Sequence, residues 1–80
     1  MIKNWQDFDE WRISSLEYHK HISEDSYSNS LTFFEKARAY FNKHGFPKPN
    51  YYKNGKVKPF TQKESIEQKK QIHNWIRTNF

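Results

Sequence analysis

The segment from Phe46 to Phe60 restricts the folds open to this chain more than any other, because it holds a tight-turn signal between two prolines. The pair Asn54-Gly55 predicts a β-hairpin with a type I′ turn, in which both central residues need a positive φ. Pro47 prevents a preceding helix from continuing, and Pro59 stops the second strand. We therefore expect short strands at residues 50–53 and 56–58.

Apolar residues at helical spacing precede and follow this segment. Asn4 is placed to cap a first helix. Gly45 is expected to end a second one in the left-handed C′ conformation, which only glycine reaches without strain. Thr61 and Glu64 form the capping box of a third helix. We expect a narrow apolar stripe on that helix, made of Ile66, Ile72, Ile76 and Phe80. The predicted order is an amphipathic acidic helix at 4–22, a helix at 31–44, a hairpin at 50–58 and a basic helix at 62–79.

Residues 23–29, Ser-Glu-Asp-Ser-Tyr-Ser-Asn, separate the first two predicted helices. Such side chains compete with a helix for backbone hydrogen bonds, so this composition predicts a loop. Ser28 or Ser30 is then expected to cap the second helix. The 80 residues are short for one domain, and we expect residues 1–80 to form a single α+β domain with the order helix, helix, β-hairpin, helix.

The apolar content of the chain is small and mostly aromatic. Apolar residues make up 34% of the chain, and aromatic residues make up 19%. There is no cysteine, so no disulfide stabilises this short domain. Stability is therefore expected to come from the packing of large rings, or to be shared with a partner.

The sequence contains no membrane-spanning or secretory signal. No run of 18 apolar residues occurs, and acidic residues interrupt the first 20 positions, where a signal peptide needs an apolar stretch. These residues are Asp7, Asp9, Glu10 and Glu17. We expect a cytoplasmic protein that does not contact a membrane.

Charge is divided unevenly along the chain. Residues 1–30 hold three Lys and Arg against six Asp and Glu, a net charge of −3, whereas residues 31–80 hold eleven against three, a net charge of +8. From Lys36 to Lys58 there are seven basic residues and no acidic one. Such a field attracts a polyanion. The alternative is that these lysines keep a small domain soluble and protect an exposed sheet edge.

No pattern for catalysis, a cofactor or a metal is present. Four histidines occur, but His19 and His21 are two positions apart on a helix and point to different faces. There is no cysteine ligand, no H-E-x-x-H pattern and no glycine-rich phosphate loop. We therefore predict a protein that is not an enzyme and holds neither a metal nor a cofactor.

The layout resembles a known group of small proteins. A helix ends just before Phe46-Pro47-Lys48-Pro49, a basic hairpin follows around Lys53-Asn54-Gly55-Lys56, and Glu64-Ser65-Ile66 opens another helix. Over residues 31–76 this resembles the excisionases and AlpA-like regulators of phages and other mobile elements. The resemblance implies a small winged-helix-like domain that binds double-stranded DNA, without chemistry of its own, in excision or transcription regulation.

In that family the helix before the turn enters the major groove, and the hairpin is a wing that contacts the DNA backbone or the minor groove. The resemblance implies Lys36, Arg38, Asn42 and Lys43 on the groove-facing helix, where we expect one face to carry them. It implies Lys53, Asn54, Lys56 and Lys58 on the wing. Arg38 suits guanine and Asn42 suits adenine, whereas the wing lysines neutralise phosphates. Tyr51 and Tyr52 alternate on the strand, so we expect one of them to pack on the core.

A second class of function explains the acidic, aromatic first helix better. In this alternative the chain is a phage-encoded module that binds and inhibits or redirects a host protein. Aromatic side chains on the first helix, Trp5, Trp11 and Tyr18, then form the protein interface. Proteins of the resembled family also contact a phage protein or one another, so self-association on DNA is a further expectation.

Overall fold

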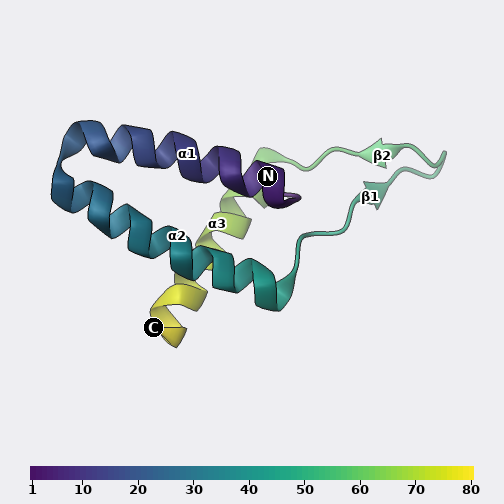
Figure 1. Cartoon of the computed structure of the whole chain (residues 1–80). Helices are drawn as coiled ribbons and strands as arrows, with labels where there is room; N and C mark the ends of the chain where they lie inside the picture. Colours follow the sequence, from purple (N-terminus) through teal and green to yellow (C-terminus); the bar gives the residue numbers. More distant parts are fainter.

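Helix α1 forms one half of an antiparallel helix pair at the start of the chain (Figure 1). The structure, a computed structural model, describes all 80 residues. Helix α1 spans Trp5–Ile22, and the side chain of Asn4 accepts a hydrogen bond of 2.8 Å from the backbone N–H of Asp7. The predicted first helix and its N-cap are therefore confirmed.

Helix α2, Glu24–His44, forms the other half of the pair. The predicted loop at residues 23–29 is wrong, because only Ser23 separates the two helices. Ser23 is extended, with φ −171°, and its Oγ accepts a hydrogen bond of 3.0 Å from the N–H of Ser26. Its own N–H donates to the carbonyl of His19 at 3.2 Å. One extended residue thus ends α1 and caps α2. The serines expected as caps lie inside α2, at Ser28 and Ser30.

Helix α2 ends at Gly45, as predicted, but with a different backbone conformation. Gly45 has φ 73°, and its N–H donates to the carbonyl of Phe41 at 2.8 Å. Phe46 then folds back and stacks on Phe41, with ring centroids 4.7 Å apart and an interplanar angle of 18°. The predicted left-handed conformation of Gly45 is wrong, because its ψ is −170° and the chain leaves the helix in an extended direction.

Two short strands follow. Strand β1 is Asn50–Tyr51 and strand β2 is Val57–Lys58, and they pair antiparallel. Both lie inside the predicted strands but are shorter. The domain is mostly helical, with three helices and this short hairpin between the second and third.

Helix α3, Gln62–Asn79, has the predicted bounds. The backbone N–H of Thr61 donates to Oε1 of Glu64 at 3.0 Å, and the N–H of Glu64 donates to Oγ1 of Thr61 at 3.2 Å. The predicted capping box is therefore confirmed. None of the three helices is long and apolar enough to cross a membrane.

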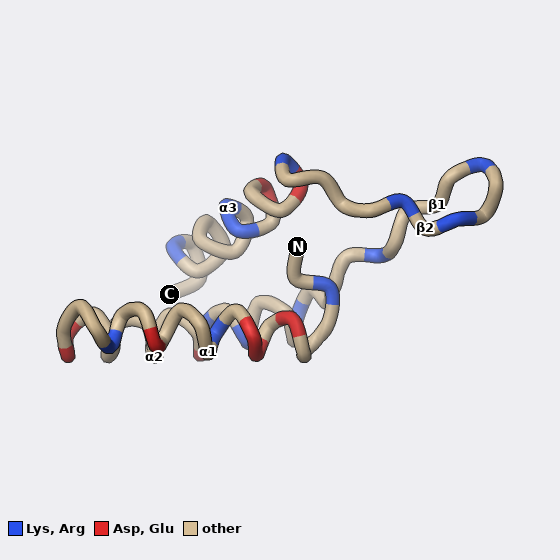
Figure 2. The backbone as a smooth tube through the Cα atoms, turned by 90° about the horizontal axis from the view of Figure 1, so that it is seen from above, with Lys and Arg blue, Asp and Glu red and all other residues tan.

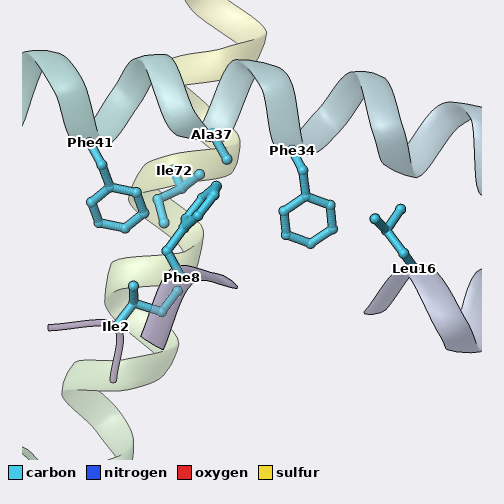
Figure 3. Close-up of a cluster of buried hydrophobic side chains, with 7 residues drawn as sticks. All are labelled: Ile2, Phe8, Leu16, Phe34, Ala37, Phe41 and Ile72. Carbon is cyan, nitrogen blue, oxygen red and sulfur yellow. The ribbon is translucent and has the colours of Figure 1, made fainter. Parts of the chain in front are cut away.

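Helix α3 crosses the α1–α2 pair on one side, and the core lies between them (Figures 1 and 2). Figure 3 shows the buried side chains converging from all three helices and the amino-terminal segment. Phe8 and Ile72 have no exposed surface. The predicted stripe on α3 is wrong in part, because Ile66 and Phe80 are exposed. The core consists of Ile2, Phe8, Leu16, Phe34, Ala37, Phe41 and Ile72.

Candidate nucleic-acid interface

The hairpin stands clear of the helices. Strands β1 and β2 pair with each other and pack against no helix. Every residue from 48 to 59 is exposed. Figures 1 and 2 show the hairpin projecting from the end of the molecule where α2 stops. The molecule measures 50 Å in its longest dimension. Both faces of the hairpin are therefore open to a partner.

The turn of the hairpin has three residues and not two. The N–H of Tyr52 donates to the carbonyl of Lys56 at 2.8 Å, and the N–H of Gly55 donates to the carbonyl of Tyr52 at 2.9 Å. Gly55 has φ 83°, but Asn54 does not have a positive φ. The predicted type I′ turn is therefore wrong, and the pattern is that of a three-residue loop closed by a glycine bulge.

Asn54 has a structural task within this turn. Its Oδ1 accepts a hydrogen bond of 3.1 Å from the backbone N–H of Lys56. This contact is the local side-chain bond that makes asparagine common in turns. Of the predicted wing residues, Asn54 therefore holds the loop in shape, while the lysines beside it carry the charge.

The two faces of the hairpin differ in chemistry. Tyr51 lies opposite Val57, so these two apolar side chains share one face. The other face carries Asn50, Tyr52, Lys56 and Lys58, given the pairing of Asn50 with Lys58 and the backbone bond between Tyr52 and Lys56. The expectation that one tyrosine packs on the core is wrong, because Tyr51 is 61% exposed and Tyr52 is 50% exposed. The hairpin is too far from the helices to bury either ring.

None of the lysines of the hairpin forms an ion pair. Four lie between residues 48 and 59, all exposed, and the segment contains no acidic residue. The single ion pair of the molecule joins Nε of Arg12 to Oδ1 of Asp9 at 3.7 Å, within α1. The hairpin charge is therefore free to act on a ligand. The four lysines are Lys48, Lys53, Lys56 and Lys58.

Lys58 also acts on the start of α3. Hydrogen bonds from the backbone and the side chain of Thr61 lower the pKa of the Glu64 carboxyl below its usual value, and the charge of Lys58 adds a smaller effect in the same direction. Glu64 thus stays ionised down to lower pH and holds the helix start that follows the hairpin.

The candidate residues on α2 fall on two flanks of the helix. The ammonium of Lys36 lies 5.2 Å from the ring centroid of Phe80, at the end of α3, whereas the guanidinium of Arg38 lies 5.7 Å from the ring centroid of Phe8, in α1. Two positions along a helix correspond to a rotation of about 200°. Asn42 is four positions after Arg38 and lies on the same flank as Arg38. Lys43 is seven positions after Lys36 and lies on the same flank as Lys36. The expectation that one face carries all four is therefore wrong.

Lys43 is the charged candidate on α2 nearest to the hairpin along the chain. It lies in the last turn of the helix and is exposed, as is Asn42. Lys48 also belongs to this exposed basic segment, although only the charge run, and no motif, indicates it. Lys43 and the four hairpin lysines are together called the basic hairpin surface below.

The aromatic residues proposed for a protein interface differ in exposure. Trp5 is 42% exposed and packs edge-on against Phe8 and Phe46, with ring centroids 5.4 and 5.1 Å apart. Trp11 is half-buried against the core, and Tyr18 is 65% exposed. Tyr18 is therefore the most accessible of the three.

The histidines do not gather with other ligand types. No group of three or more His, Asp or Glu side chains lies close enough to hold a metal ion. Instead, Nδ1 of His19 lies 2.7 Å from Oγ of Ser26, and the His73 ring stacks on Phe33. These contacts place both histidines at helix interfaces.

No protein-family model, no curated protein and no solved structure matches the chain.

Proposed function

We propose that this chain is a small DNA-binding protein that acts without chemistry of its own and contacts the duplex through the basic hairpin surface. The observation that carries the proposal is the hairpin itself: residues 48–59 are all exposed, hold four lysines that form no ion pair and stand away from the helices. A projecting cationic ribbon of this kind fits a phosphate backbone. The proposal includes a winged-helix-like arrangement of the domain. It also includes a role in excision or transcription regulation in a phage or mobile element.

Affinity is expected to come mainly from the release of counterions. Each phosphate neutralised on B-DNA contributes about 0.9 to the slope of log K against log salt concentration. If the four hairpin lysines each neutralise one phosphate, they contribute about 3.6 to that slope. Binding should therefore weaken steeply as salt is added.

The flank of α2 that carries Arg38 and Asn42 reads the base sequence in this proposal. Both side chains are exposed, and they lie one helical turn apart. Arginine suits guanine and asparagine suits adenine in the major groove. Lys36 and Lys43, on the other flank, are suited to phosphates.

Fluorescence anisotropy with a labelled duplex at several salt concentrations tests the proposal. The triple variant Lys53→Ala, Lys56→Ala, Lys58→Ala should lower the slope of log K by about 2.7. A control variant, Lys20→Ala, Lys70→Ala, Arg77→Ala, removes the same charge from exposed positions on the helices. Absence of duplex binding at low salt, or an equal loss in both variants, would contradict the proposal.

One observation favours a second candidate function, the binding of a phage or host protein. Helix α1 leaves Ile13, Tyr18 and Ile22 exposed, at 49%, 65% and 55%. Exposed aromatic and aliphatic side chains on an acidic helix are suited to a partner interface. Substituting Tyr18 with Ala should weaken capture of a protein partner and leave duplex binding unchanged if this candidate function operates beside the first.

A further inference from the structure

A cavity of about 360 Å³ opens between the three helices, on a part of the molecule remote from the hairpin. It is lined from α1, the first half of α2 and the middle of α3, and no carboxylate lines it. Its size falls within the range of small-molecule sites. The polar residues that matter for a ligand are Ser15, His19, Ser26, Ser30, Lys69 and His73.

Ser30 is the buried polar residue of this cavity. It is only 7% exposed, and its Oγ forms no hydrogen bond within the chain but keeps accessible surface. Its hydroxyl is therefore available to a partner from outside the chain. The cavity is the space into which such a partner fits.

His19 and Ser26 supply a further donor. Nδ1 of His19 and Oγ of Ser26 lie 2.7 Å apart, and both residues line the cavity. If Ser26 donates to Nδ1, the neutral ring carries its proton on Nε2; if Nδ1–H donates to Ser26, the hydroxyl proton is free. In both cases one hydrogen-bond donor of the pair remains for a ligand.

Lys69 brings a positive charge to the cavity. Its ammonium lies 5.9 Å from the ring centroid of Trp11 and forms no ion pair. Asp7 and Glu10 border a neighbouring hollow that Lys69 also lines, but they do not line this cavity. An ammonium together with several hydroxyl and imidazole groups, and no carboxylate, favours an oxyanion.

Aromatic rings form the rest of the wall. Trp11 and Phe33 pack edge-on, with centroids 5.9 Å apart, and His73 stacks on Phe33 at 4.7 Å. These surfaces suit an apolar or aromatic part of a ligand. The cavity therefore offers an ammonium and several hydrogen-bond donors among aromatic surfaces.

From this combination we propose that the cavity binds a small organic phosphomonoester. Lys69, Ser30 and the His19–Ser26 pair bind its phosphate, and Trp11 and Phe33 contact its organic part. This site is separate from the basic hairpin surface and does not depend on DNA binding.

Titration with adenosine 5′-monophosphate, followed by the fluorescence of the protein and by backbone amide shifts, tests the site. Saturable binding should shift the amides of Ser26, Ser30 and His73. Inorganic phosphate and adenosine, which each lack one half of the ligand, should both bind more weakly. Lys69→Gln and Ser30→Ala should each weaken binding by about tenfold, the usual loss for a hydrogen bond to a charged group.

Lys70→Gln is the matched control, because it removes the same charge at the next position, which does not line the cavity. It should change affinity by less than about twofold. The triple hairpin variant should retain binding of adenosine 5′-monophosphate, which separates this site from the proposed DNA surface. Equal losses in Lys69→Gln and Lys70→Gln, or no saturable shift at the three amides with any of the probes, would overturn the proposal.

Discussion

The side-chain amide of Gln68 pairs with both backbone polar groups of Ile2. Its Nε2 donates to the carbonyl of Ile2 at 2.7 Å, and its Oε1 accepts from the N–H of Ile2 at 3.0 Å. Both residues are buried. The amino-terminal segment is thus attached to α3 by a hydrogen-bonded pair inside the core, which leaves no polar group of this contact unsatisfied.

Replacing Gln68 with Ala should therefore destabilise the domain. Two buried backbone groups of Ile2 would lose their partners, at a cost of about 1–3 kcal/mol each. Urea unfolding should show a decrease in the free energy of unfolding of about 2–6 kcal/mol. Gln71→Ala, at an exposed position of the same helix, should change it by less than about 0.5 kcal/mol. Equal effects of the two substitutions would show that the amide pair does not contribute.

Gly45→Ala should also destabilise the fold, and for a backbone reason alone. At Gly45 a Cβ would meet no atom within 4 Å, but φ 73° with ψ −170° lies in a region that only glycine adopts readily. The expected cost is about 1–3 kcal/mol in the free energy of unfolding. Gly55→Ala places a side chain at a residue with a positive φ in the hairpin. Because the hairpin packs against no helix, this substitution should leave the thermal unfolding of the helices nearly unchanged.

Glu64 should make the stability of the fold depend on pH in the acid range. Hydrogen bonds from Thr61 lower its pKa in the folded state below the usual value of 4.5. The folded state then binds fewer protons than the unfolded state, so this stabilisation is present above about pH 4.5 and is lost as pH falls through the folded pKa. As the pH is lowered from about 6 to about 3, the Glu64→Gln variant should lose less thermal stability than the unsubstituted protein. An identical loss in both proteins would contradict the assignment.

Phe8 is the aromatic centre of the core and should tolerate truncation poorly. It has no exposed surface and packs edge-on against Phe34 and Phe41, with centroids 6.2 and 5.7 Å away. Phe8→Ala should cost about 3–5 kcal/mol, enough to unfold much of so small a domain. Tyr18→Ala, at an exposed ring of the same helix, should leave the circular dichroism spectrum and the unfolding midpoint nearly unchanged.

Residues with a local role were predicted well from the sequence. Asn4, Gly45 and the pair Thr61 and Glu64 act through hydrogen bonds and backbone angles within one helical turn. Such interactions can be recognised from a few neighbouring residues. The helix boundaries that depend on them were therefore predicted correctly.

The errors arose where distant contacts override local preference. The serines of residues 23–29 favour a loop only weakly. By lying in α2, Ser26 gains a contact with His19, and the following Ser30 is buried. Gln68 occupies a core position because Ile2, 66 residues away, needs its amide. The residues of the phosphomonoester cavity likewise come from three helices, and no local pattern brings them together.

Amide chemical-shift mapping with an unlabelled duplex tests the central proposal most directly, because it reports where DNA contacts the chain. The proposal predicts that shifts concentrate on residues 48–59 and on Lys43 and fade as salt is raised. Shifts confined to the exposed side of α1, around Ile13 and Tyr18, with none in the hairpin, would contradict it.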